Sequence, residues 1–375
     1  MLGGVMCSRM LARLDDAVAS AASPLEVDCK RAERAAYQAR LGMSEEARAE
    51  LDRLRQQYGS RPAVAMSAWL HLVDGLIAHF GDMSDESRIK ILRAHALSSA
   101  AGLVRTQALS AAWLAHMDYR RLNVAAMARH ATEALELSTE RDHSARSRAA
   151  LVFAQAYHFA GRLDLALPWY ASTRSHAVAE GDDATLTSLM HNMAWLRAQY
   201  LRVRDCGLTT ASSGLDEDAL LAAQPLEGFD LLIGSSSLPA LAPALRAQVL
   251  TVNSQYAEAL ALFDAELTPG ARRDKLPARP DLLADRAWCH ASLGHQAAAT
   301  QDAERAEAGI QPGAHLGDLA LVHARLSQTF GMLDRPEPAA IHRQRASEAW
   351  SVLEGVQRQI LEALHDLPPP KSWGG

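Results

Sequence analysis

The side chains most able to carry catalysis or bind a metal ion are spread thinly along this chain. It contains 15 histidines and 4 cysteines, but no two histidines stand four residues apart, and neither HExxH nor CxxC occurs. The usual spacings of metal ligands are therefore missing. Cys289 and His290 are neighbours, but adjacent side chains on a helix diverge by about 100° and cannot form a local dyad. We predict no catalytic residue, no metal and no cofactor.

Sequence motifs for nucleotide binding and ester hydrolysis are missing as well. Neither GxxxxGK[ST] nor GxGxxG is present, so no glycine-rich loop is expected to hold a phosphate. The segment GSSSL at Gly234–Leu238 lacks the second glycine of a nucleophile elbow. These observations predict a protein that is not an enzyme.

The composition favours closely packed helices. Of the 375 residues, 49% are hydrophobic but only 5% are aromatic, and alanine and leucine are the main apolar types. Such residues are good helix formers, whereas a large sheet needs β-branched and aromatic side chains. An all-β fold and extensive disorder are both excluded. We expect an all-α protein.

Charge and apolar patterning predict a protein of the cytoplasm. The net charge is −6, so no basic surface favours nucleic acid. The four cysteines lie far apart, which fits a reducing compartment better than a disulfide framework. The start of the chain does not resemble a signal peptide, and Leu231–Leu245 is too short and too interrupted by proline to cross a membrane. We expect neither a membrane nor a nucleic-acid partner.

The chain repeats itself with a period of about forty residues. Aligning AQAYHFAGRLDLALPWY, RAWCHASLGHQAAATQDAERA and LRAQVLTVNSQYAEALALF defines one turn residue in each unit. The same register predicts eight turns, at Gly42, Gly81, Leu122, Gly161, Leu201, Ser254, Gly294 and Asp334. Successive turns lie 39 to 41 residues apart, except for 53 between Leu201 and Ser254. One insertion therefore interrupts a regular array of helix pairs.

Small and large residues recur at matched places around these turns. Small residues stand seven positions before the turn at Ala35, Ala115, Ala154, Ala194, Ala247 and Ala287. Five positions after it stand Ala47, Met127, Ala166, Ala259, Ala299 and Ala339. Large residues follow nine positions after it at Leu51, Tyr170 and Phe263. This pattern lets two helices approach closely while a bulky side chain fills the gap to the next pair.

This pattern resembles the tetratricopeptide repeat (TPR), most clearly in Ala154, Gly161, Ala166 and Tyr170. The resemblance implies a right-handed α-solenoid of about eight antiparallel helix pairs. The long units are similar to the TPR sensor regions of bacterial regulators, which implies binding of a protein, a peptide or a small ligand. The period is longer than the usual TPR unit, and HEAT-type hairpins are the alternative fold.

The insertion and the C-terminal composition suggest a domain division. We expect an N-terminal TPR-like array of about five pairs in 1–204 and an irregular hinge in 205–243. A second array of about three pairs would occupy 244–367, and PPPKSWGG in 368–375 would be a disordered tail.

The TPR resemblance also implies which side chains line the concave groove. Counting back from each turn gives residues rich in hydrogen-bonding groups and rigid apolar area, as recognition sites are. They are His116, Tyr119, Arg148, Gln155, His158, His191 and Trp195, with Asn192 beside them. The alternative is that Trp195 and its neighbours pack between repeats and bind nothing.

Three functions follow from this pattern. The first is a non-catalytic scaffold that holds a segment of another protein in the groove. The second is a ligand-responsive regulatory module, a sensor of a peptide or small molecule whose two arrays hinge about 205–243 and which works with a separate output protein. The third is an enzyme with a degenerate site at His158 or His191 and a nearby acid.

Overall fold

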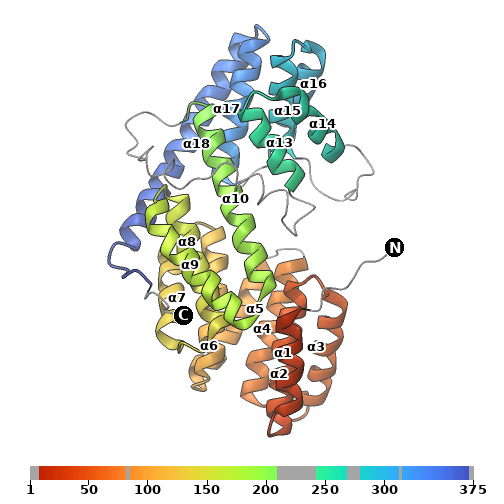
Figure 1. The fold of residues 1–375 in the computed structure, drawn as a ribbon, viewed down its shortest axis with the longest axis vertical. Helices are drawn as coiled ribbons and strands as arrows, with labels where there is room; N and C mark the ends of the chain where they lie inside the picture. Colours follow the sequence, from red (N-terminus) through yellow and green to blue (C-terminus); the bar gives the residue numbers. More distant parts are fainter. Residues whose placement is uncertain (1–7, 82–84, 209–241, 268–278, 312–314, 371–375) are drawn as a thin grey trace. The chain divides into compact units, whose positions relative to one another are not determined.

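The computed structural model describes residues 8–81, 85–208, 242–267, 279–311 and 315–370. Within these ranges the chain forms sixteen helices and no strand (Figure 1), which confirms the predicted all-α class. The helices are α1 (Arg9–Ser20), α2 (Pro24–Arg40), α3 (Ser44–Tyr58), α4 (Val64–Gly81), α5 (Asp85–Ala100), α6 (Val104–Arg120), α7 (Val124–Leu137), α8 (His143–Phe159), α9 (Leu163–Glu180), α10 (Asp183–Asp205), α13 (Ala242–Val252), α14 (Tyr256–Leu267), α15 (Pro280–Ser292), α16 (Gln296–Ala308), α17 (Leu316–Met332) and α18 (Pro336–Ala363).

The chain divides into two compact units, which we describe separately. Unit 1 comprises Met1–His158, Arg162–Leu189 and Ile360–Gly375, and unit 2 comprises Phe159–Gly161 and Met190–Gln359. The boundaries expected from the sequence stay a prediction, because most of the expected hinge (209–241) and tail (371–375) lies outside the described residues.

Most of the predicted turns occur where the register places them. Six of the eight turn residues have a positive φ angle: Gly42, Leu122, Gly161, Ser254, Gly294 and Asp334. At Gly294, for example, the following N–H of His295 donates to the carbonyl of His290 at 2.9 Å. This bond satisfies a carbonyl that the end of a helix would otherwise leave without a partner. Gly81 is the last residue of α4, and the residues after it are not described.

The turn predicted at Leu201 is wrong. Leu201 lies inside α10, which continues to Asp205, and the first positive φ after it is at Gly207. The continuation keeps the Arg202 side chain, one residue further, in the interior of unit 2. The helix ends before Gly207, which adopts the left-handed conformation at no steric cost.

The matched small residues form a buried seam, as predicted. Ala35, Ala115, Ala154, Ala247 and Ala287 all have an exposed fraction of 0%, as do Ala47, Ala166, Ala259 and Ala299. Met127 and Ala339 are also buried, whereas Ala194 is half-buried. The large residues Leu51, Tyr170 and Phe263 are buried too. Buried small side chains therefore flank most of the turns, as close packing of two helices requires, and a bulky side chain is buried further along in three of the units.

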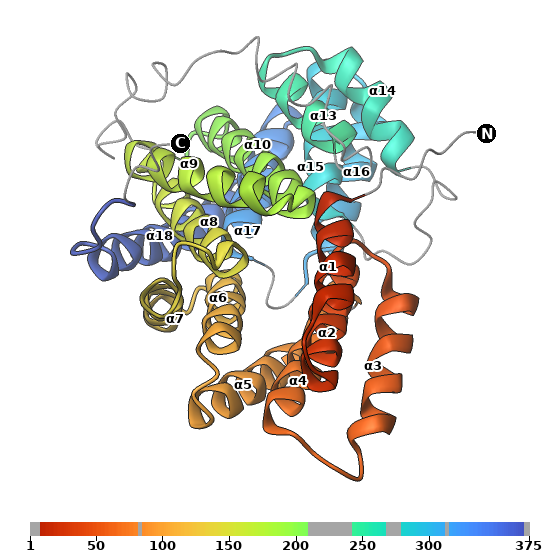
Figure 2. The same ribbon diagram turned by 60° about the horizontal axis from the view of Figure 1, so that its bottom comes forward.

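In unit 1, consecutive helices from α1 to α7 contact each other, and α2 and α4 also pack together (Figure 2). One core joins α2 through α6, with Leu51, Met66, Leu72, Ile91 and Trp113 among its buried members. The helix α4 is long and apolar enough to cross a membrane by length and composition alone. Its burial in this core explains that composition.

The N-terminal helix α1 packs against the turn between α9 and α10. The Arg9 guanidinium lies 3.0 Å from the Asp183 carboxylate, and Arg13 donates to the Ala179 carbonyl at 2.6 Å. Gly181 in this turn has φ +75°, and a Cβ there would stand 2.9 Å from the Cβ of Arg9. Glycine is required at this position by both the backbone conformation and the close approach.

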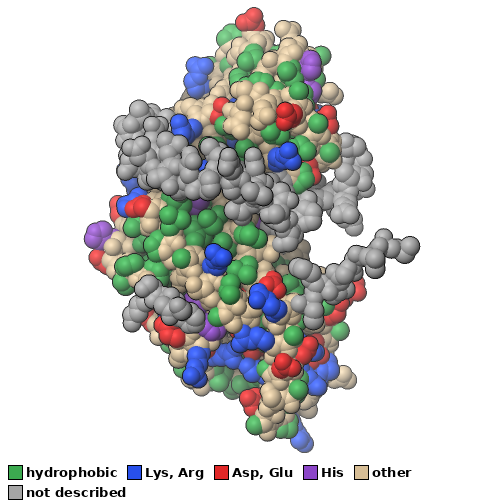
Figure 3. Space-filling view, in the orientation of Figure 1, with side chains coloured by type: hydrophobic (Ala, Val, Ile, Leu, Met, Phe, Trp, Pro, Cys, Tyr) green, Lys and Arg blue, Asp and Glu red, His purple; other side chains and the backbone are tan. Residues whose placement is uncertain are grey.

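Unit 2 has two smaller cores built from the same kinds of residues. Ala247, Phe263 and Leu282 pack together between α13, α14 and α15. Ala287, Leu326 and other apolar residues pack between α15, α16 and α17. On the face drawn in Figure 3, Lys and Arg side chains lie among Asp and Glu side chains rather than in one broad basic field.

Candidate functional site

The eight side chains expected in the groove fall into the two separate units. His116 and Tyr119 on α6, and Arg148, Gln155 and His158 on α8, belong to unit 1. His191, Asn192 and Trp195 on α10 belong to unit 2. All eight are buried or half-buried. The structure therefore presents two candidate sites, one in each unit.

Unit 2 contains a cavity of about 420 Å³, large enough for a small molecule. Its walls come from α10, α13, α15 and α17 and from the segment that follows α16. Two of the expected residues, His191 and Trp195, line it, whereas Asn192 does not. The remaining lining residues are Gln199, Ala244, Leu245, Gln248, Arg279, Pro280, Asp281, Gly309, Ile310, Gln311, His315, Asp318, Leu319 and Val322.

Helix geometry explains how the polar side chains reach this cavity. His191, Trp195 and Gln199 are spaced four residues apart on α10, so they share one face of the helix. Asp281 and Asp318 both stand in the first turns of their helices, α15 and α17. A carboxylate in the first turn interacts favourably with the helix dipole.

The two aspartates of the cavity are in opposite electrostatic situations. Arg279 forms two hydrogen bonds with Asp281, at 3.0 and 2.9 Å. Burial disfavours the charged form of Asp281, but the bonds and charge of Arg279 outweigh it and lower the pKa of that carboxyl. Burial, with the nearby charge of Asp281, instead raises the pKa of the Asp318 carboxyl. Asp281 therefore stays ionised, while Asp318 takes up a proton more readily than a free aspartate.

Several polar groups that face the cavity have no protein partner among the described residues. The Gln248 side chain is 5% exposed, yet its amide makes no hydrogen bond within the described part of the chain. The Trp195 indole N–H and the His191 ring are likewise unpaired within the described ranges. A buried polar group without a partner costs free energy. A ligand that bonds to these groups would recover that cost.

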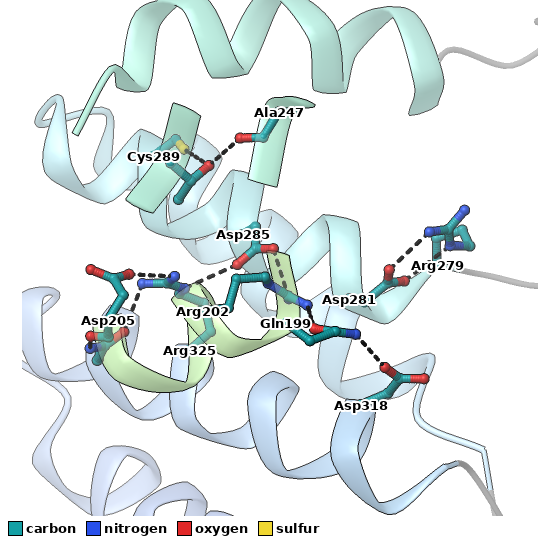
Figure 4. A network of polar contacts seen from close by, with 12 residues as sticks. Gln199, Arg202, Asp205, Ala247, Arg279, Asp281, Asp285, Cys289, Asp318 and Arg325 are labelled. Carbon is teal, nitrogen blue, oxygen red and sulfur yellow. Dashed lines mark hydrogen bonds and ion pairs between the residues drawn. The ribbon is translucent and has the colours of Figure 1, made fainter. Parts of the chain in front are cut away.

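A buried network of charged side chains adjoins the cavity (Figure 4). Asp285 lies between two arginines, with one carboxylate oxygen 2.8 Å from Arg202 and the other 3.0 Å from Arg325. Arg202, Asp285 and Arg325 are at most 1% exposed. Asp205 completes the group, 2.6 Å from Arg325.

Gln199 joins this network to the cavity wall. Its carbonyl oxygen accepts a hydrogen bond from Arg202 at 2.7 Å, and its amide donates to Asp318 at 3.0 Å. Gln199 thus contacts both the buried arginine and a carboxylate that faces the cavity. Protonation of Asp318 would therefore alter a hydrogen bond of the same side chain that contacts Arg202.

This network was not among the features expected from the sequence, although the repeat contains a signal for it. Asp285 and Arg325 each stand nine residues before a turn, at Gly294 and Asp334. Four other units carry an apolar residue at that place, whereas the first has Glu33 and the fifth has Asn192. Charged residues at a mostly apolar position of consecutive repeats indicate a buried ion pair.

The candidate site of unit 1 is centred on Trp113, which was not among the expected residues. The Arg148 guanidinium lies over the Trp113 ring at 4.2 Å, and that of Arg40 lies 5.7 Å from the same ring. The His116 and His79 rings meet it edge-on, with centroids 5.8 and 6.1 Å away. Two of the expected groove residues, His116 and Arg148, are therefore brought together by an indole between them.

The electrostatics of this cluster follow from burial. Burial, with the charge of Arg40, lowers the pKa of the Arg148 guanidinium to about 9. Burial, with the charge of Arg120, lowers the pKa of His79 to about 4, and burial lowers that of His116 well below its usual range. The two imidazoles are therefore neutral at pH 7.

The other expected residues of unit 1 lie further along the same helices. The Tyr119 hydroxyl donates to the carbonyl of Gln155 at 3.5 Å. The His158 ring and the Tyr170 hydroxyl are 3.0 Å apart. These contacts hold α6, α8 and α9 together and are compatible with a structural role.

Metal and thiol chemistry find no support in the described residues. They contain no group of three or more His, Cys, Asp or Glu side chains that could hold a metal ion. Burial raises the pKa of the Cys289 thiol to about 12, and its sulfur lies 3.3 Å from the Thr251 hydroxyl. Such a thiol is a poor nucleophile at neutral pH.

Comparison with models of known protein families, with curated proteins and with solved structures finds no match to this chain. The function must therefore be argued from the two sites themselves.

Proposed function

We propose that this protein is a non-catalytic, TPR-like α-solenoid that binds a small molecule with an apolar body and a few hydrogen-bonding groups in the cavity of unit 2. In this proposal it acts in the cytoplasm as a ligand-responsive regulatory module, together with a separate output protein. It needs no metal, cofactor, membrane or nucleic acid for that role.

The regular turns and the alanine seam support the solenoid part of the proposal. Gly161 and Leu122, like Gly294 and Ser254, are left-handed turn residues about one repeat apart. Within each unit, helices two apart in sequence contact each other, including α2 with α4 and α15 with α17. Stacked helix pairs produce this order of neighbours.

The unpaired polar groups of the cavity carry the ligand-binding part. Gln248 offers a donor and an acceptor, Trp195 a donor, and Asp318 a carboxyl oxygen in addition to the one bonded by Gln199. Leu245, Leu319 and other aliphatic residues provide apolar wall between them. This combination fits a molecule with an apolar body and two or three hydrogen-bonding groups.

Ligand binding can be tested with a defined panel of free amino acids, nucleosides and small amines. Compounds that raise the melting temperature are then titrated by calorimetry against the wild type and the Gln248→Leu variant. Because Leu cannot replace the amide bonds, we expect affinity to fall at least about tenfold, which corresponds to about 1.4 kcal/mol. Gln255→Leu, at an exposed position, is the matched control. Failure of the whole panel, or equal affinity in Gln248→Leu, would contradict the proposal.

A protein-interaction scaffold is the second candidate, and one observation favours it. The helices α2, α4 and α6 begin with exposed aliphatic residues, Leu25 (39% exposed), Val64 (51%) and Val104 (49%). Because α2 contacts α4 and α4 contacts α6, these residues could form a docking surface for a partner. Capture of that partner from native cells should be lost in Val64→Asp and Val104→Asp. Capture should persist in Val178→Asp, which changes an exposed residue elsewhere in unit 1.

A further inference from the structure

Arg148 is a buried cation that no described residue neutralises by direct contact. It is 5% exposed, and its guanidinium makes no hydrogen bond or ion pair with any residue in the described ranges. The central carbon of the guanidinium lies over the face of Trp113, 4.2 Å from the ring centroid. Stacking on an indole stabilises a guanidinium, but the stacked group can still donate hydrogen bonds in its own plane.

The carboxylate whose charge acts on Arg148, that of Asp182, is already used by other groups. Asp182 lies 2.9 Å from Arg40, and its two oxygens also accept from the backbone N–H and the hydroxyl of Thr185, at 2.9 and 2.8 Å. Arg40 also donates to the Thr185 hydroxyl at 2.7 Å. Asp182 is therefore fully occupied with Arg40 and Thr185.

Among the charged side chains that pack on Trp113 or pair with one that does, one positive charge is left without compensation. Arg120, whose charge also acts on His79, is exposed to solvent. Arg40 and Arg148 contribute two positive charges and Asp182 one negative charge. His79 and His116 contribute none near pH 7, because their pKa values are lowered. An uncompensated buried charge is costly, and proteins normally pair it.

A second unsatisfied group belongs to a residue that contacts the same indole. The Nδ1 atom of His116 is buried and has no hydrogen-bond partner among the described residues. His116 stands three residues after Trp113 on α6, so both side chains point to the same side of that helix. A neutral imidazole protonated at Nδ1 is a hydrogen-bond donor.

We propose that unit 1 binds one oxyanion, a carboxylate or phosphate group of a small molecule, at the Arg148 guanidinium beside Trp113. The planar guanidinium donates two parallel hydrogen bonds to such a group. Nδ1 of His116 supplies a further donor, and the single negative charge balances the excess positive charge of the cluster. This site lies in unit 1 and is independent of the cavity proposed for unit 2.

The test compares melting temperatures of the full chain in chloride, acetate and phosphate at pH 7.5 and matched ionic strength. Acetate is the probe for a carboxylate group and phosphate the probe for a phosphate group, so the comparison shows which of the two the site binds. Each oxyanion is used at ten times its dissociation constant for the protein. For at least one of them, we expect the melting temperature of the wild type to be about 3 °C higher than in chloride. Arg148→Met should lose this rise and, in chloride, melt at or above the wild type, because it removes an unpaired buried charge.

Two further variants complete the test. Arg148→Lys keeps the charge but not the two parallel bonds, so it should retain less than half of the rise even if Arg148→Met fails to fold. Arg162→Met, which changes an exposed arginine of unit 1 paired with Asp164, should keep the full rise. Equal melting temperatures of the wild type in all three salts, or an undiminished rise in Arg148→Lys, would overturn the proposal.

Discussion

The Arg202 guanidinium lies 2.8 Å from the Asp285 carboxylate, and both side chains are at most 2% exposed. Arg202 belongs to α10 and Asp285 to α15, so this ion pair joins two helices in the interior of unit 2. Asp285 is also bonded to Arg325 of α17 at 3.0 Å. Asp285 is therefore shared by two buried arginines, and Arg325 is paired with Asp205 as well, at 2.6 Å.

Replacing that carboxylate should destabilise the protein strongly. In Asp285→Asn, Arg202 keeps its charge but loses the carboxylate paired with it, whereas Arg325 still has Asp205. Leaving one buried charge unpaired costs about 3–5 kcal/mol. Chemical denaturation followed by circular dichroism measures the loss. Asp264→Asn is the matched control, since Asp264 is 62% exposed and paired with Arg286, and it should cost about 0–1 kcal/mol. Similar costs for both variants would show that the buried network contributes no more than a surface pair.

The alanine seam can be tested on a single helix. Ala299 of α16 has an exposed fraction of 0%, whereas Ala297, two residues earlier, is exposed. Ala299→Leu inserts three carbon atoms into a closely packed contact and should lower the free energy of unfolding by about 1–3 kcal/mol. Ala297→Leu should change it by less than about 0.5 kcal/mol. Denaturant midpoints of the two variants decide this, and equal midpoints would argue against close packing at the seam.

Alanine substitutions at Gly181 and Gly42 can distinguish the stability cost of backbone strain from that of a steric contact. Both have positive φ, +75° and +80°, but a Cβ at Gly42 would meet nothing within 4 Å, whereas one at Gly181 would stand 2.9 Å from Arg9. Gly42→Ala should therefore cost only the left-handed strain, about 1–2 kcal/mol. Gly181→Ala should cost more, because α1 must also move. If thermal melting shows the two variants to be equally stable, the packing of α1 on this turn is looser than described.

A buried pair of histidines should make unit 2 sensitive to acid. The Nδ1 atoms of His323 and His342 are 2.9 Å apart, and burial lowers the pKa of both rings to about 4. An unfolded histidine has a pKa near 6.5, so the unfolded state binds more protons between pH 6.5 and 4. The free energy of unfolding must then fall as the pH falls through this window, by about 2 kcal/mol per histidine between pH 7.5 and 5.

The variant His342→Phe tests this pH dependence. Phe can stack on Phe330, as the His342 ring does at 5.5 Å, but it cannot titrate. Denaturation at pH 7.5 and pH 5 should show an acid loss smaller than that of the wild type by about 2 kcal/mol. The exposed His365→Phe serves as the control and should behave like the wild type. The half-exposed Glu307, 3.4 Å from Nε2 of His342, would reduce the effect by favouring the charged ring. An unchanged acid loss in His342→Phe would contradict the assignment.

Part of the candidate sites was predictable from the repeat register. Counting from the turns identified His191 and Trp195, which line the cavity, and His116 and Arg148, which meet around Trp113. The register could not identify Trp113 or Asp182 as their neighbours. Arg40 and Asp182 are 142 residues apart, and a repeat pattern carries no information about contacts over such a separation.

Local chemistry in the sequence was enough to determine the helical class, six of the turns and the alanine contacts within pairs. These features depend on residues within one repeat, where helix propensity, a left-handed turn and side-chain size act directly. Folding in three dimensions decided the rest: how far α10 extends beyond Leu201, which charges are buried together and where the cavity opens. A charge can remain in the interior only when another helix supplies its partner, and only the packing of the helices determines which partner that is.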